Sequence, residues 1–96
     1  MKVRYSPESV DDLQRVVEFV EVKNPFAARR IAIDIQEGVE KLKQFPKIGL
    51  PVMKASDPEK IRDLYVGNYT ARYLISDKCI YILRIWHNKE NDKNLQ

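Results

Sequence analysis

The sequence predicts an α+β fold in which a helix hairpin packs on one face of a small antiparallel sheet, in the order β-α-α-β-β-β. The first half of the chain holds two apolar stripes at helical spacing, each introduced by a capping residue and a proline. The second half holds three runs rich in isoleucine, tyrosine, valine and leucine, separated by two-residue turn sequences. A chain of 96 residues has room for one core, so we expect residues 1–96 to form a single domain.

The first helix is predicted from its start signal and its apolar stripe. Residues 2–5 alternate in character and predict a short strand before it. Ser6 and Pro7 then supply an N-cap and a proline at the first helical position, where the missing N–H has no cost. Apolar residues recur at helical spacing as far as Val22, so we expect the helix to end near there.

A second helix is predicted to follow after a very short connection. Asn24 and Pro25 repeat the start signal, and Phe45-Pro46 is expected to end the helix because proline cannot continue it. Two helices joined so closely pack antiparallel as a hairpin. Their apolar faces need a third surface to cover, and the second half of the chain is expected to supply it.

The sheet is predicted from the second half of the chain. Residues 46–60 hold three prolines and one glycine, which predicts a loop with a short edge strand around residues 51–53. Strands are expected over residues 61–66, 69–76 and 79–86. The sequences between them, GN and DK, suit tight hairpin turns, so the three strands form an antiparallel meander. The last strand is almost wholly apolar and is therefore expected to be central.

If both turns are two-residue loops, they determine which residues of neighbouring strands lie opposite each other. Under this assumption Leu64 faces Ala71, which in turn faces Arg84 across the second hairpin. The sheet face so defined carries Arg62, Leu64, Val66, Tyr69, Ala71, Tyr73, Ile82, Arg84 and Trp86. On the other face Asp63 lies directly opposite Arg72. A helix hairpin covers only one face, so a partner is expected to dock on the uncovered one.

Composition excludes several classes of protein. No apolar stretch reaches the roughly 20 residues that span a bilayer, and the N-terminus lacks the apolar region of a signal peptide, so we expect a cytoplasmic protein. One cysteine and one histidine are too few for an internal disulfide or a structural zinc site, so we expect no metal and no cofactor. The net charge of +3 permits an acidic partner, and residues 23–54 alone carry +4.

Arginines within the predicted strands are informative, because arginine is rare inside a sheet without an anionic or aromatic partner. One reading is structural, with Arg72 paired to Asp63 across the hairpin. Arg84 would then stack on Tyr73 or Trp86. The other reading is functional, with the arginines forming a cationic groove for an acidic segment or a phosphate backbone. Both readings stay open at this point.

The sequence offers little for catalysis. It contains no glycine-rich phosphate loop, no nucleophile elbow and no metalloprotease motif. His87 is the only imidazole, and it is read either as a general acid or base or, more simply, as a polar residue at a strand end. Cys79 is expected to be a small core or turn residue rather than a nucleophile. No catalytic residue is assigned from these features.

Four segments together resemble a known superfamily. They read NPFAARR, FPKIGLP, IRDLYVGNYTARYLI and IYILRIWHNKE, and their order and spacing are similar to those of the RelE/ParE toxin superfamily of bacterial type II toxin–antitoxin systems. The resemblance covers nearly the whole chain in the same order of elements. It implies a small, basic, cytoplasmic toxin that a cognate antitoxin holds inactive with an extended or helical acidic segment.

The two branches of this superfamily differ on the exposed sheet face. The ribosome-dependent mRNA endonucleases rely on basic side chains there. This sequence instead has Thr70 after the tyrosine that opens the middle strand, and Asp63 and Tyr65 on the preceding strand. These departures disfavour RNA cleavage, whose transition state needs cationic stabilisation. FPKIGLP and LRIWHNKE are closer to the ParE branch, whose members poison DNA gyrase by binding, although Leu50 stands where an arginine is usual.

The resemblance therefore implies a ParE-like inhibitor of DNA gyrase, neutralised by a ParD-like antitoxin with an acidic C-terminal segment. The target-binding residues are expected to be Arg62, Arg84, His87 and Lys89. The antitoxin is expected to contact the amphipathic helices and the sheet edge, and neither membrane binding nor direct DNA binding is expected. Two alternatives stay open, a module that only binds its antitoxin and a RelE-like ribonuclease that uses Arg72, Arg84, His87 and Lys89.

Overall fold

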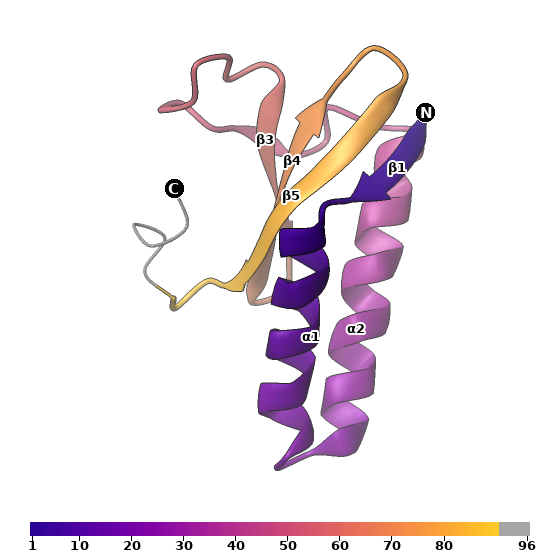
Figure 1. Cartoon of the computed structure of the whole chain (residues 1–96), viewed down its shortest axis with the longest axis vertical. Helices are drawn as coiled ribbons and strands as arrows, with labels where there is room; N and C mark the ends of the chain where they lie inside the picture. The colour runs from indigo at the N-terminus through magenta and orange to yellow at the C-terminus, as the bar shows by residue number, and fades with distance from the viewer. Residues whose placement is uncertain (91–96) are drawn as a thin grey trace.

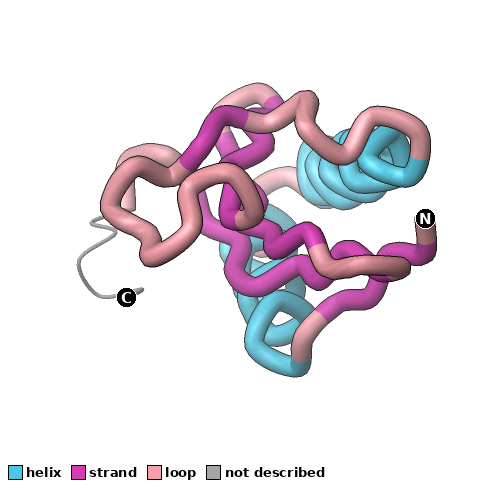
Figure 2. Tube along the Cα trace, turned by 90° about the horizontal axis from the view of Figure 1, so that it is seen from above, coloured by secondary structure: helices cyan, strands magenta, loops and turns pink. Residues whose placement is uncertain are grey.

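The computed structural model describes residues 1–90, in which two antiparallel helices lie against one face of a five-stranded sheet (Figure 1). In chain order the elements are β1 (Lys2–Tyr5), α1 (Pro7–Glu21), α2 (Pro25–Glu40), a 3-10 turn (Lys41–Lys43), β2 (Leu50–Pro51), β3 (Ile61–Val66), β4 (Tyr69–Ile75) and β5 (Cys79–His87). Seen from above, the loop from β2 to β3 projects away from the helices (Figure 2). The predicted α+β class and order of elements are confirmed. None of the helices within residues 1–90 is long and apolar enough to cross a membrane.

The strands follow the order β1-β5-β4-β3-β2, so β5 is an interior strand and not an edge, as its apolar sequence predicts, while β4 is the middle strand. β3, β4 and β5 form the predicted antiparallel meander, and β2 pairs antiparallel with β3. The prediction of a purely antiparallel sheet is wrong at one edge, because β1 pairs with β5 in parallel. These are the first and last strands, and all the chain between them serves as the long connection that a parallel pair requires.

Both helices begin where the sequence predicts. The side chains of Ser6 and Asn24 accept hydrogen bonds from backbone N–H groups three residues further on, each at 3.0 Å. The prediction that the second helix continues to Phe45 is wrong in its last turn, because α2 ends at Glu40. A tighter 3-10 turn follows, which redirects the chain toward β2 while Leu42 stays fully buried.

The register of the meander agrees with the prediction in its first part. On β3 and β4, Leu64 lies opposite Ala71 as expected. On β4 and β5, Tyr73 lies opposite Ile82, also as expected. An irregularity then follows on β5, and beyond it Ala71 lies opposite Ile85.

The prediction that Ala71 faces Arg84 is therefore wrong. Leu83 is an extra residue with no partner opposite it on β4, so every later residue of β5 is shifted by one position. Arg84 lies opposite Arg72, and residues opposite each other share a face. Arg84 and Trp86 consequently lie on the face of Arg72 and not, as predicted, on the face of Ala71.

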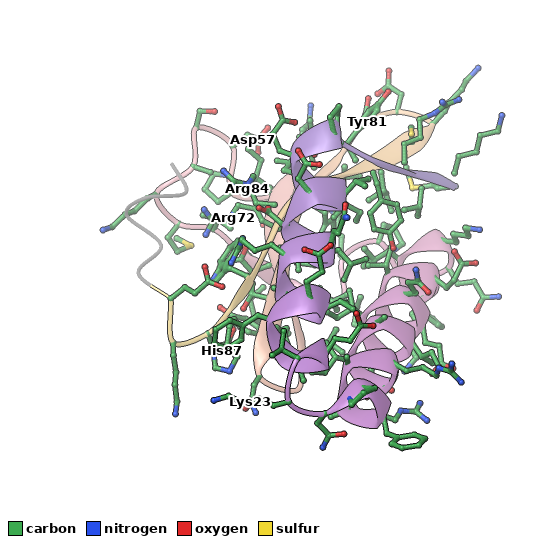
Figure 3. All side chains as sticks on the ribbon, turned by 60° about the horizontal axis from the view of Figure 1, so that its bottom comes forward. Lys23, Asp57, Arg72, Tyr81, Arg84 and His87 are labelled. Atoms are coloured by element: carbon green, nitrogen blue, oxygen red, sulfur yellow. The ribbon has the colours of Figure 1, made fainter. Side chains whose placement is uncertain are left out.

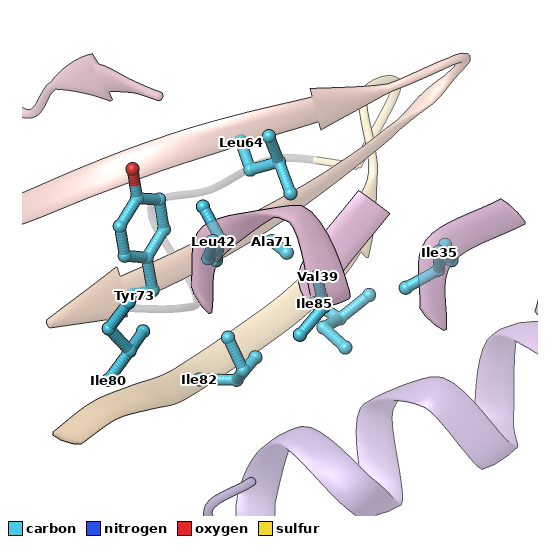
Figure 4. Packing of buried hydrophobic residues seen from close by; sticks show 9 residues of the cluster. All are labelled: Ile35, Val39, Leu42, Leu64, Ala71, Tyr73, Ile80, Ile82 and Ile85. Carbon is cyan, nitrogen blue, oxygen red and sulfur yellow. The ribbon is translucent and has the colours of Figure 1, made fainter. Parts of the chain in front are cut away.

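The core lies between the helices and the sheet (Figure 4). Its buried residues are Ile35, Val39, Leu42, Leu64, Ala71, Tyr73, Ile80, Ile82 and Ile85. α2 approaches β3 so closely that a Cβ atom on Gly38 would lie 2.8 Å from a methyl carbon of Val66. Glycine at this position therefore permits the packing of α2 on β3.

Candidate protein-binding site

Arg72 is held on the exposed sheet face by two partners. Its Nε and Nη2 atoms lie 2.8 and 3.0 Å from the two carboxylate oxygens of Asp63, which is opposite on β3. Its guanidinium carbon lies 5.0 Å from the centroid of the Trp86 ring, close enough for a cation–π interaction. The structural reading of Arg72 is confirmed, and an anionic partner balances its charge within the sheet.

Arg84 pairs with a residue that the sequence did not suggest. Its Nε and Nη2 atoms lie 2.8 and 3.1 Å from the two carboxylate oxygens of Asp12 on α1. The hydrogen bond with Asp12 raises the pKa of Arg84 above its usual value. The aromatic stacking expected for Arg84 is instead made by Arg72, on Trp86.

The open edge of β5 explains the position of Asp12. β1 pairs with β5 only as far as Ile82, and α1 passes the part of the strand beyond it. The N–H of Ile85 on this edge donates to Oδ2 of Asp12 at 2.9 Å. A carboxylate whose side chain is only 6% exposed is thereby satisfied by a backbone N–H and a guanidinium.

A line of polar contacts continues from Asp12 along α1 to the end of β5. Arg15 lies 3.8 Å from Asp12 and 3.2 Å from Glu90. The same Glu90 oxygen accepts the backbone N–H of His87 at 3.1 Å, and His87 Nδ1 accepts the N–H of Lys89 at 3.0 Å. Three of the four expected target-binding residues lie along this line: Arg84, His87 and Lys89.

An apolar groove lies beside this line, between α1, the start of β4 and the end of β5. Its volume is about 650 Å³, and its lining residues are Arg15, Val16, Phe19, Val20, Tyr69, His87, Lys89 and Glu90. The rings of Tyr69 and His87 meet edge to face with centroids 5.0 Å apart, and Phe19 is 81% exposed. Figure 3 shows Arg84 and His87 beside α1. Apolar walls with charged side chains at the rim suit a segment of another protein.

Arg62 lies apart from the other expected target-binding residues. It points to the sheet face opposite to that of Arg84 and is only 8% exposed. Its Nε donates to the carbonyl of Gly49 at 3.1 Å, and its Nη1 donates to the carbonyl of Glu59 at 3.2 Å. The structure does not bring Arg62 together with the other three residues.

A family described as the ParE toxin of the type II toxin-antitoxin system, parDE, matches residues 3–92. The chain belongs to the ParE toxin family. A chain in the structure of the chromosomal ParDE TA system from P. aeruginosa is similar to it, with a TM-score of 0.75, 26% identity, and coverage of 91% of this chain and 95% of that one. A chain in the crystal structure of the toxin-antitoxin complex RelBE2 from Mycobacterium tuberculosis shares the fold, with a TM-score of 0.68, 23% identity, and coverage of 90% and 95%. No curated protein matches the sequence.

The chemistry of the site in this member of the ParE family is that of ion pairs beside an apolar groove. Arg72 and Arg84, which the ribonuclease alternative needs as cations, are each held by two hydrogen bonds to a carboxylate. His87 Nδ1 already accepts a backbone N–H. Within residues 1–90, no group of three or more histidine, cysteine, aspartate or glutamate side chains is placed to hold a metal ion. The arrangement is suited to contact with a protein surface.

Proposed function

We propose that this chain is a toxin that inhibits DNA gyrase by binding to it. The observation that carries the proposal is the groove between α1 and the end of β5, whose rim holds His87 and Lys89 and adjoins the Arg84 ion pair. An apolar centre with a charged rim is the usual composition of a protein–protein interface. Lys89 is exposed, so its ammonium group is free to steer the approach of an acidic surface on the target.

The ion pairs of the sheet face also support binding rather than RNA cleavage. Cleavage of a phosphodiester needs cations aimed at the negative charge that develops in the transition state. Asp63 and Asp12 already engage the guanidinium groups of Arg72 and Arg84 through charge-assisted hydrogen bonds. A substrate phosphate would have to displace a carboxylate from each.

We further propose that a cognate, ParD-like antitoxin neutralises the toxin in the cytoplasm. Both similar structures belong to toxin–antitoxin systems, which supports an antitoxin as partner. The helix hairpin offers apolar surface for it to cover, since Phe19, Val22 and Phe26 are 81 to 86% exposed.

A supercoiling assay tests the target. Purified protein is titrated into purified gyrase with relaxed plasmid, and we expect a dose-dependent loss of supercoiling that antitoxin relieves. Normal supercoiling at every concentration would overturn the gyrase proposal. Cleavage of mRNA in a translating extract, mapped by primer extension, would then favour the ribonuclease alternative. Harmless overexpression with tight antitoxin binding would favour a module that only binds its antitoxin.

A further inference from the structure

The segment of residues 45–53, between the 3-10 turn and the loop to β3, exposes apolar side chains beside lysines. The exposed fractions are 60% for Phe45, 50% for Ile48, 60% for Leu50 and 79% for Met53. Residues 41–54 contain four lysines and no acidic residue. The surface of this stretch is therefore both apolar and positively charged.

Two of the lysines have carboxylate partners from outside this stretch, but both pairs are exposed. Lys43 Nζ lies 2.9 Å from Glu40, and Lys47 Nζ lies 4.0 Å from Glu59. All four of these side chains are 44% exposed or more, and ion pairs at such exposure contribute little. The positive charge of Lys47 in segment 45–53 and of the flanking lysines is thus available to a partner.

Buried polar side chains fix the backbone of segment 45–53. The hydroxyl of Tyr73, a fully buried residue, donates to the carbonyl of Pro46 at 2.7 Å and accepts the N–H of Gly49 at 3.0 Å. The guanidinium of Arg62 holds the carbonyl of Gly49 from the same side. A Cβ atom on Gly49 would lie 2.7 Å from both the Tyr73 hydroxyl and the carbonyl oxygen of Asp63. These contacts hold the backbone of residues 46–49 against the sheet.

This arrangement matters because a fixed segment loses less conformational entropy on binding than a flexible one. Burial of the Arg62 guanidinium and the Tyr73 hydroxyl is unfavourable unless both groups form hydrogen bonds. The backbone of residues 46–49 provides hydrogen-bond partners for both. The fold thus holds the outward side chains of Ile48 and Leu50 in place while they remain exposed to solvent.

The surface extends beyond segment 45–53 along α2. One hollow is lined by residues 44–48, and a second is lined by residues of α2 and β3, among them Gly38 and Tyr65. Ile48 lines both hollows, so they meet at this side chain. The second hollow is also lined by Asp34 and Glu37, so a partner segment that continues from Phe45 into it would meet it with apolar rather than acidic side chains.

We propose that segment 45–53 is a docking surface for a protein segment in which carboxylate and apolar side chains alternate, and that this surface is separate from the groove between α1 and β5. Carboxylates match the exposed lysines, and apolar side chains cover Ile48 and Leu50, which a phosphate backbone cannot do. The inference rests on the proposed function, because the antitoxin is the partner from which we expect this segment. Arg62 acts in it as a positioning residue that holds Gly49 and makes no contact with the partner.

The test measures the affinity of purified toxin for the protein encoded by the adjacent reading frame. One variant combines Ile48→Ser with Leu50→Ser, and a second combines Lys47→Glu with Lys54→Glu. The control is Lys78→Glu at the tip of the hairpin between β4 and β5, where the lysine is exposed and lies outside the surfaces assigned to either partner. We expect the first two variants to raise Kd about tenfold or more and the tip variant to leave it unchanged. The segment variants should inhibit gyrase as the parent protein does.

Unchanged affinity in the segment variants, or an equal loss in the tip variant, would overturn the docking surface and leave the proposed function standing. A loss confined to the lysine variant, together with binding of a labelled DNA or RNA oligonucleotide, would show a nucleic-acid surface and overturn it as well. Antitoxin binding that depends on segment 45–53 without gyrase inhibition would support the docking surface and contradict the gyrase target. Absence of any binding by the parent protein would overturn both the docking surface and the antitoxin proposal.

Discussion

Arg84 on β5 and Asp12 on α1 form a two-point ion pair, with distances of 2.8 and 3.1 Å, that ties the first helix to the last strand. The Asp12 carboxylate also accepts the N–H of Ile85, and its side chain is only 6% exposed. The pair therefore differs from an exposed surface pair, because removal of the carboxylate leaves a buried backbone donor and a partly buried charge without an acceptor.

Substitution of this carboxylate should destabilise the fold. We expect Asp12→Ala to lower the free energy of unfolding by about 2–4 kcal/mol. Asp12→Asn keeps an oxygen for the N–H of Ile85 and should cost less. Urea denaturation measures both, with Asp11→Ala as the control, since Asp11 is the exposed neighbour on the same helix. Equal losses in the Asp11 and Asp12 variants would contradict the structural role of the pair.

Alanine substitutions at Gly49 and Gly67 separate two reasons for a glycine, steric crowding at Gly49 and a left-handed backbone at Gly67. A Cβ atom on Gly49 meets the Tyr73 hydroxyl and a backbone carbonyl at 2.7 Å, whereas one on Gly67 meets nothing within 4 Å. Gly67 has φ +57°, so Gly67→Ala should cost about 1–2 kcal/mol for its left-handed backbone alone. Gly49→Ala should cost about 2–3 kcal/mol and shift the NMR signals of neighbouring Ile48. A Gly49→Ala variant as stable as the parent would show that the backbone around residue 49 shifts at little cost to accommodate the Cβ atom.

The strands and helices could be predicted because their signals are local. A cap followed by proline fixes the start of each helix, and the two-residue turn at Gly67 fixes the register of β3 against β4. The bulge at Leu83 left no such trace, because it lies in a run where almost every residue is apolar and either register looks acceptable. The error in the face of Arg84 follows from that single extra residue.

Candidate site residues were harder to predict than the fold, because their partners are distant in sequence. Asp12 and Arg84 are 72 positions apart, and an aspartate near the start of a helix already has a sufficient local explanation in the helix dipole. Arg62 was predicted to lie in a strand, and it does. The burial of Arg62 depends on residues 47–49, whose backbone folds back over its side chain. No periodic pattern in the sequence predicts this loop conformation.

Charge reversal at the rim of the groove tests the proposed gyrase contact. We expect Lys89→Glu to weaken inhibition of supercoiling about tenfold or more, because the new carboxylate repels the acidic surface that the lysine is proposed to meet. Lys23→Glu at the tip of the hairpin makes the same charge change on another exposed lysine and should leave inhibition unaltered. Circular dichroism of both variants confirms that the fold is retained. Equal inhibition by the two variants would place the target contact elsewhere.

Alkaline pH should destabilise the protein through its buried tyrosines. Burial raises the pKa of Tyr73 above the usual value, although the hydrogen bond from Gly49 and the charge of Arg62 oppose the shift. In the unfolded chain tyrosine loses its proton near pH 10, so above about pH 10 the unfolded state is stabilised first. The free energy of unfolding should fall as the pH rises from there through the pKa of the folded state.

Tyr73→Phe should reduce this slope without abolishing it, because burial also raises the pKa of Tyr5 and Tyr69. Urea titrations between pH 8 and pH 11 that give the same slope for parent and variant would exclude Tyr73 as a source of the pH dependence.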